Sequence, residues 1–200
     1  MLYRKYLFVL EKSFMKDDKF SILYEDEIEV KDVSKNENVL KSRTDTSARG
    51  SATTTPVDKA FIVRAVAIDK DGNKSDVVTK TYFVGKNKYK SGNVVSLVTD
   101  SKNLIDENNG IYVTGKAYND YVKNGSQGTA PLYNWDGTGR EWEREGNFSL
   151  IKQGNLDFSQ NIGMRIHGYG GRTSQLKSLN IYARDCYGSG TFDSPIFDGV

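Results

Sequence analysis

The sequence predicts a mainly β fold built in two parts, and three observations support this prediction. Aromatic residues that favour strands are frequent (12 Tyr and 9 Phe), and 19 glycines stand against 3 prolines, which is typical of strands joined by glycine turns. Residues 61–84 carry the pattern of two strands around a polar turn. No segment has a sustained helical period, and no repeat of fixed spacing is visible.

The N-terminal segment is expected to be either a first strand or a stretch outside the fold. Its apolar run, YLFVL, ends at Glu11 after five residues. This run is too short for the apolar region of a signal peptide or for a membrane span, so neither is predicted. Further on, Ile28 and Val30 alternate with charged residues within 21–33, which is the period of a half-buried strand.

The next segments predict a loop followed by a hairpin. Residues 42–55 are rich in Ser, Thr, Arg and Gly and have no apolar face, so we expect a mobile loop. Residues 61–68 and 77–84 read as two strands, and the sequence DKDGNK between them has the residues of a tight turn. The two strands are therefore expected to pair as a hairpin.

A calcium site is the alternative interpretation of that turn. Asp69, Asp71 and Asn73 occupy positions 1, 3 and 5 of a possible calcium loop. Positions 6 and 12, which need glycine and glutamate, hold Lys74 and Lys80 instead. The flanking segments are strands and not helices, so a solvated hairpin turn is the prediction.

The polar, basic stretch 85–93 is bracketed by glycines and predicts a linker. It divides the chain into a first domain, 1–85, a linker, 86–93, and a second domain, 94–200. The second domain is expected to contain strands, one helical turn and one long polar loop. The predicted elements are strand 94–98, a helical turn 102–106 capped by Ser101, a tight turn 108–110, strand 111–114, loop 116–139 and strand 142–151.

Charge and rare residues exclude several classes of function. Lys and Arg total 28 and Asp and Glu total 26, so the net charge is 28 − 26 = +2, and no nucleic-acid partner is predicted. The single cysteine, Cys186, cannot form an internal disulfide and is expected to be a small buried or half-buried side chain. His167, the one histidine, is interpreted as structural, and no Cys/His set for zinc exists.

Positive charge nevertheless gathers in one stretch, GMRIHGYGGRTSQLKSLNIYAR at residues 163–184. Three glycines (Gly168, Gly170 and Gly171) predict a tight connection between two short strands. Lys177 shares the apolar face of the second strand, where burying an ammonium is costly unless an anion pairs with it. A phosphate would satisfy both the lysine and the glycine N–H groups. The alternative is an ordinary exposed hairpin whose cations meet solvent or nearby acids.

This stretch resembles the signature of the CotH family of spore-coat-type atypical protein kinases. In that signature, G-x-R-x-x-G is followed by a small-residue turn, an Arg, and K-S. The matching residues are Gly163, Arg165, Gly168, Arg172, Lys177 and Ser178. The upstream sequences NNGIYVTG and GREWEREG are also similar to opening segments of the family, and the resemblance covers 94–200.

The first part is similar to the chitobiase/β-hexosaminidase C-terminal-type β-sandwich, also called an Fn3-associated module. The similar segments are LYEDEIEVKDVSKNENVLKSRTDTS and DKAFIVRAVAIDKDGNKSDVVTKTYFVG. The D-G-S-x-P-type turn of that module is missing, so its first strand is expected to be lost or replaced by residues 1–14. The two resemblances together imply a partial Ig-like β-sandwich followed by the β-rich N-terminal part of a CotH-like α+β kinase domain.

The resemblance implies an ATP-dependent transfer of phosphate to protein Ser or Thr, with Mg²⁺, on a bacterial surface or spore coat. By position it makes Lys177 the nucleotide-phosphate residue, with lesser roles for Arg165 and Arg172 and for the turn glycines Gly170 and Gly171. The family's catalytic acids lie C-terminal to this signature, and Asp185, Asp193 and Asp198 match no family acid motif. The chain is therefore expected to be a fragment truncated at both ends that does not catalyse phosphotransfer alone.

Two other functions stay open. A non-catalytic surface module could bind protein or glycan through aromatic side chains near the long loop, although we favour the interpretation that Trp135 and Trp142 anchor the loop in the core. The aromatic residues are Tyr118, Tyr121, Tyr133, Trp135 and Trp142. A glycosidase would need paired acids such as Glu143 and Glu145, but we interpret these two as solvated charges.

Overall fold

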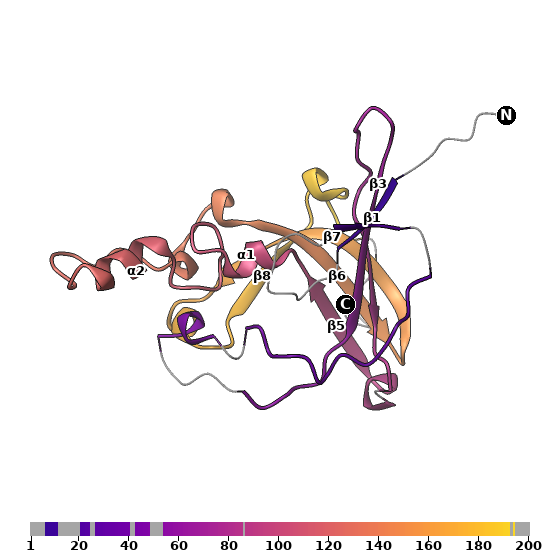
Figure 1. Cartoon of the computed structure of the whole chain (residues 1–200), viewed down its shortest axis with the longest axis horizontal. Helices are drawn as coiled ribbons and strands as arrows, with labels where there is room; N and C mark the ends of the chain where they lie inside the picture. Colours follow the sequence, from indigo (N-terminus) through magenta and orange to yellow (C-terminus); the bar gives the residue numbers. More distant parts are fainter. Residues whose placement is uncertain are drawn as a thin grey trace. The chain divides into compact units, whose positions relative to one another are not determined.

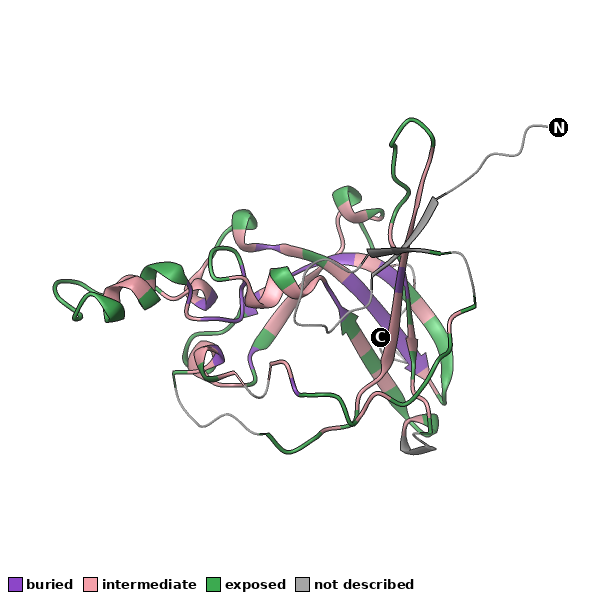
Figure 2. Cartoon of the chain, viewed as in Figure 1, coloured by how far each residue is buried: buried purple, intermediate pink, exposed green. Residues whose placement is uncertain are grey.

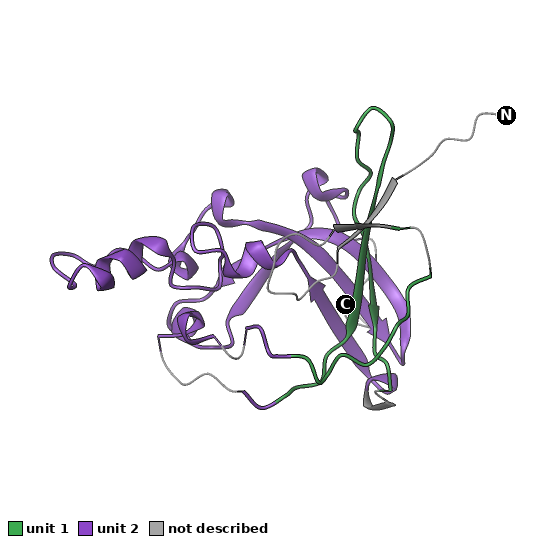
Figure 3. Ribbon diagram, viewed as in Figure 1, with its two compact units in different colours: residues 1–36, 56–88 green, residues 37–55, 89–200 purple. Residues whose placement is uncertain are grey.

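The computed structural model describes residues 7–11, 21–24, 27–40, 43–48, 54–85, 87–192 and 194. The chain divides into two compact units (Figure 3). Unit 1 comprises Met1–Asn36 and Pro56–Lys88, and unit 2 comprises Glu37–Thr55 and Tyr89–Val200. The described residues form two four-stranded sheets with antiparallel pairing, so the mainly β fold class is confirmed.

Unit 1 contains the sheet β2-β1-β3-β4. Its strands are β1 (Leu7–Glu11), β2 (Ser21–Leu23), β3 (Phe61–Ile68) and β4 (Val78–Tyr82). The predicted hairpin is confirmed, because β3 pairs with β4 from Phe61 opposite Tyr82 to Ala65 opposite Val78. The N-terminal apolar run forms a strand, as one of its two interpretations predicted.

The turn after β3 is built by Asp69. Its carboxylate accepts hydrogen bonds from the Asp71 and Asn73 backbone N–H groups and from the Asn73 side chain, each at 2.9 Å. These bonds, that from the Asn73 side chain foremost, lower the pKa of Asp69. The carboxylate is therefore used to close the turn, and the prediction of a hairpin turn is confirmed.

The strand expected across 21–33 is mostly wrong. After β2 ends at Leu23, the described residues 27–33 form no strand. Val30 is exposed, and no strand of the sheet pairs with this segment. Alternation of apolar and charged residues gives a strand only where a neighbouring strand can pair with it. Residues 27–33 have no such neighbouring strand among the described residues.

Unit 2 contains the sheet β5-β6-β7-β8 (Figure 1). Its strands are β5 (Asn93–Val98), β6 (Arg144–Lys152), β7 (Asn155–His167) and β8 (Ser178–Tyr182). Strands β6 and β7 form a long hairpin closed by Gln153 and Gly154, both at positive φ, +49° and +80°. This two-residue turn suits the twist of the strands that it joins.

The core lies on one face of this second sheet. Alternate residues of β6 and β7 are buried there: Phe148, Leu150, Ile162, Met164 and Ile166. Ile111, Tyr112 and Trp135 pack against them from the connecting segments. Figure 2 shows that burial is concentrated on β6 and β7, whereas α2 is exposed or half-buried.

The helices are short. They are α1 (Ser101–Ile105), α2 (Lys116–Lys123) and the 3-10 turns η1 (Thr44–Thr46), η2 (Asn87–Lys90), η3 (Asn134–Asp136), η4 (Arg140–Trp142), η5 (Gly170–Thr173) and η6 (Asp185–Tyr187). Among the described residues, no helix combines the length and apolar character needed to cross a membrane.

Three predictions in unit 2 need correction. Helix α1 is capped by Asp100 and not by Ser101, since the Asp100 side chain accepts from the Lys102 N–H. Helix α2 lies inside the predicted loop 116–139. It buries no residue, and its apolar residues, although spaced as in an amphipathic helix, extend over only about two turns. Segment 111–114 is not a strand, because its N–H groups bond to the carbonyls of Asn103, Leu104 and Asp45.

Candidate functional site

The six signature positions lie in unit 2, between the second half of β7 and the first residue of β8, with Arg172 in η5. Arg165 is half-buried and His167 is exposed, whereas Leu179 and Ile181, on the apolar face predicted for the second strand, pack against the core. The hairpin therefore forms as expected, and its cations can be followed one at a time.

Lys177 is buried, with 8% of its surface exposed. Its ammonium donates to three backbone carbonyls: Thr46 at 2.8 Å, Arg172 at 2.6 Å and Ser174 at 2.8 Å. It also lies 4.0 Å from the ring centroid of Trp135 and 5.1 Å from that of Tyr112. A lysine ammonium has three N–H donors, so this arrangement uses all of them.

Burial sets the charge state of this lysine. Removal from water lowers the pKa of Lys177 to about 8, and the charge of Asp136 opposes that decrease. The group is therefore mostly an ammonium at neutral pH. Carbonyl dipoles and ring faces stabilise it in place of the anion that the sequence led us to expect.

The two arginines also hold backbone carbonyls. Arg172 donates to Trp135 O at 2.6 Å, and also to the carbonyls of Gly137, Gly168 and Ile166. Arg165 donates to Gly139 O at 2.6 Å and to the Tyr182 hydroxyl at 2.8 Å. Together they fasten the chain around η3 and η4 to the hairpin.

The turn between the strands is open. An added Cβ at Gly168, Gly170 or Gly171 would meet no atom within 4 Å, and Gly168 has a φ of +89°. His167 and Tyr169 beside them are exposed, Tyr169 at 97%. The glycine turn therefore offers accessible backbone next to the lysine and the arginines.

Residues 43–48, here called the strap, were predicted only as part of a mobile loop. Instead, they bind to the body of unit 2 through their backbone. The Asp45 carbonyl accepts from the Thr114 N–H at 2.9 Å, and the Ala48 N–H donates to Thr173 O at 3.0 Å. Thr46 is completely buried, and its carbonyl is one of the three that hold Lys177. Nothing in the polar strap sequence indicated this docking.

A second buried charge, Glu143, was also missed. Its side chain is 0% exposed and accepts from Arg184 at 2.8 and 2.9 Å and from the Tyr187 hydroxyl at 3.0 Å. The Arg184 hydrogen bond lowers the pKa of Glu143, whereas burial raises the pKa of Tyr187 to about 12. Glu143 is thus a buried structural partner and not the solvated charge predicted, while Glu145 is exposed as expected.

The aromatic residues form a ladder from α2 towards Lys177. Ring centroids of Tyr118 and Tyr133 are 4.3 Å apart, and those of Tyr133 and Trp135 are 4.5 Å apart. Trp135 is 0% exposed, so it anchors the loop in the core, as one of the two interpretations expected. Trp142 is half-buried and has the Arg144 guanidinium 5.4 Å from its centroid.

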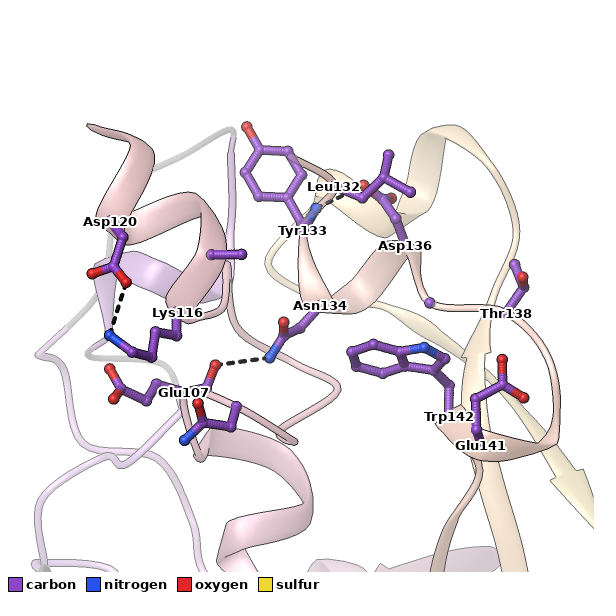
Figure 4. A pocket seen from close by; sticks show the side chains of 13 residues that line it. Glu107, Lys116, Asp120, Leu132, Tyr133, Asn134, Asp136, Thr138, Glu141 and Trp142 are labelled. Carbon is purple, nitrogen blue, oxygen red and sulfur yellow. Dashed lines mark hydrogen bonds and ion pairs between the residues drawn. The ribbon is translucent and has the colours of Figure 1, made fainter. Parts of the chain in front are cut away.

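An open pocket of about 640 Å³ lies between α2 and η4 (Figure 4). Four carboxylates line it (Glu107, Asp120, Asp136 and Glu141) against one cation, Lys116. Lys116 is paired with Asp120 at 2.8 Å. The lining is therefore acidic, which suits a cationic ligand better than a phosphate.

Two further predictions concern possible metal or thiol chemistry. Cys186 is exposed and not buried, with the Arg140 guanidinium 3.4 Å from its sulfur. No three His, Cys, Asp or Glu side chains gather as metal ligands anywhere in the described ranges. Asp185 is exposed, whereas Asp193 and Asp198 lie outside the described residues.

Comparisons of this chain with models of known protein families, with curated proteins and with solved structures find no match. The resemblance to CotH-type kinases and to the Fn3-associated module therefore stays a prediction.

Proposed function

We propose that this chain is the N-terminal part of a CotH-like protein kinase and that its basic hairpin receives the phosphates of ATP. The observation that supports the proposal is that two of the signature cations, Lys177 and Arg172, lie beside one exposed glycine turn. Lys177 and Arg172 are joined through the Arg172 carbonyl, and the turn glycines beside them leave their backbone accessible. Accessible backbone N–H groups next to cations suit an anionic phosphate oxygen.

The proposal assigns nucleotide binding, and no phosphotransfer, to these residues. Mg²⁺ would arrive with the nucleotide, and a protein Ser or Thr substrate and a surface or spore-coat location belong to the same proposal. The Fn3-associated sandwich is likewise proposed for the first part of the chain. ATP in contact with Lys177 requires one of its three carbonyl partners to leave, because all three N–H donors are in use.

Titration of the full chain with MgATP, followed by NMR of backbone amides, tests this function. We expect the largest shifts at the amides of Gly168, Gly170 and Gly171. Lys177→Met should abolish those shifts, and Lys123→Met, which changes an exposed lysine of α2, should leave them unchanged. Melting curves of each variant show whether the fold is kept. Shifts that are absent at millimolar ATP, or that persist in a folded Lys177→Met chain, would contradict the proposal.

A second candidate is a module that binds a protein, and the acidic pocket favours it. The ring of Tyr133 is flanked by Tyr118 and Trp135, so it has little free surface on which a sugar could stack. The carboxylates and the exposed Leu132 suit a basic peptide with an apolar neighbour. This observation favours a protein ligand over a glycan.

The second candidate is tested with a labelled hexalysine peptide and a glycan array. We expect the peptide to bind, with weaker binding in Glu107→Gln/Glu141→Gln and unchanged binding in Glu145→Gln, which lies outside the pocket. Hits on the glycan array with no peptide binding would reject the protein-ligand alternative.

A further inference from the structure

The strap covers Lys177, the lysine of the signature. Three of its contacts with the rest of unit 2 are made by backbone atoms of Asp45, Thr46 and Ala48. The Ser47 hydroxyl adds a bond to Thr173 O at 2.9 Å. Only Thr46 is fully buried, so the strap is held mainly by hydrogen bonds and not by a large apolar surface.

The position of Thr46 is the centre of the argument. Its carbonyl oxygen lies 2.8 Å from the Lys177 ammonium, and it comes from a segment 131 residues away in the sequence. The other two carbonyls, Arg172 and Ser174, belong to the hairpin itself. Displacement of the strap would therefore free one N–H of Lys177 while the hairpin keeps the other two in place.

We propose that the strap is a cover that competes with phosphate for Lys177, and that its release opens the phosphate site of the hairpin. The carbonyl oxygen of Thr46 and an anionic phosphate oxygen are both acceptors for the same N–H, so they exclude one another. The rings of Trp135 and Tyr112, whose centroids lie 4.0 and 5.1 Å from the ammonium, do not belong to the strap and would keep the ammonium oriented. This inference rests on the proposed nucleotide function, since it describes how that same site is regulated.

Release changes the accessibility of the ammonium more than its charge. Burial lowers the pKa of Lys177 to about 8, so the covered side chain is already mostly an ammonium at neutral pH. The covered hairpin is the weaker anion site because the Thr46 carbonyl occupies one N–H of Lys177, and release makes that N–H available to a phosphate oxygen.

Two strap variants distinguish release of the strap from other consequences of a Thr→Gln substitution. Thr46→Gln places a longer neutral side chain where none fits, because Thr46 is 0% exposed. Thr44→Gln makes the same chemical change at an exposed position of the same 3-10 turn. Both variants keep the net charge, so neither adds its own attraction for phosphate.

Acetylation of lysines by an N-hydroxysuccinimide ester, mapped by mass spectrometry, reads the cover directly. In the wild type we expect Lys177 to react about 10- to 1,000-fold more slowly than exposed Lys123, as expected for an open form that is a minor population. Thr46→Gln should remove most of this protection, and Thr44→Gln should keep it. Amide exchange in β6 and β7 should stay slow in both variants, which shows that the core has not unfolded.

Binding of inorganic tripolyphosphate gives a second, independent result. If the strap opens the site, Thr46→Gln should bind tripolyphosphate at least about tenfold more tightly than the wild type. Rapid acetylation of Thr46→Gln without tripolyphosphate binding would uphold the cover and reject the phosphate function. Equally slow acetylation in Thr46→Gln and the wild type, or rapid acetylation of Lys177 in the wild type, would overturn the cover, whatever the chain binds.

Discussion

A buried lysine must find partners for its charge, and at Lys177 these partners are backbone carbonyls and aromatic rings. The sequence indicated that this side chain shared an apolar face and needed compensation. It could not indicate the source, because Thr46 lies in a polar loop without an apolar pattern. Compensation by dipoles from a distant segment leaves no local signature.

Replacement of Lys177 by Met tests this account of the buried charge. We expect Lys177→Met to lower the free energy of unfolding by about 2–4 kcal/mol, since three carbonyls lose their donor. Urea unfolding followed by tryptophan fluorescence measures the change. The matched variant Lys123→Met, on exposed α2, should change stability by less than about 0.5 kcal/mol. Equal effects at the two positions would contradict the assigned role.

Glu143 makes the stability of the chain depend on acid. Its folded pKa is lowered by Arg184, so its contribution is present above the unfolded value of about 4.3 and is lost as pH falls through the folded pKa. We expect Glu143→Gln to cost about 2 kcal/mol at pH 7 and progressively less below pH ~4. Urea unfolding from pH 7 to pH 3 measures this difference. Glu145→Gln, at an exposed position, should show no such trend.

At the scale of elements, prediction succeeded where a segment pairs with its neighbours in sequence. It failed where hydrogen bonds to distant segments determine the backbone conformation. The hairpin β3–β4 and the strand β6 carry their own alternation and turn residues. Residues 111–114 are apolar enough for a strand, yet their N–H groups bond to α1 and to the strap. The candidate site was predicted to the same extent: its hairpin was found, but the carbonyls that its cations bind were not.

Close packing around Gly163, in the middle of β7, leaves no room for a larger residue. An added Cβ would lie 2.5 Å from both Glu143 Oε1 and Tyr187 Cε2. We expect Gly163→Ala to lower the free energy of unfolding by about 1–3 kcal/mol, because the buried Glu143 and its partners must move. Gly170→Ala is the control, since its Cβ would meet open space and should cost less than about 1 kcal/mol. Chemical denaturation compares the two, and a reversed order would refute this packing role.

At the scale of the molecule, the strands of the two units for which burial is described differ in their apolar burial. Strands β6 and β7 of unit 2 bury Phe148, Leu150, Ile162, Met164 and Ile166, whereas β3 and β4 of unit 1 bury no hydrophobic side chain. The units change at Lys88 and Tyr89, inside the stretch predicted as a linker, but unit 2 also includes Glu37–Thr55. Composition did not predict this assignment, because Asp45, Thr46 and Ala48 bond through backbone groups, although Leu40 also packs against the core.

The difference in burial predicts a difference in local stability. We expect amide hydrogens of β6 and β7 to exchange at least about 100-fold more slowly than those of β3 and β4, since exchange in core strands requires global unfolding. Hydrogen–deuterium exchange with peptide mapping measures both regions in one sample. Comparable exchange rates would show that unit 1 is stabilised as strongly as the core of unit 2.

The strap also has a consequence for how the chain is made. A ribosome releases Thr46 long before Lys177, which follows 131 residues later. The β6–β7 hairpin joins strands that are adjacent in sequence, so it can form early. Docking of the strap closes a much longer loop and therefore has a larger entropic cost. During synthesis the strap therefore emerges long before Lys177 is available to bind it. Its docking is one of the last events in the folding of the nascent chain.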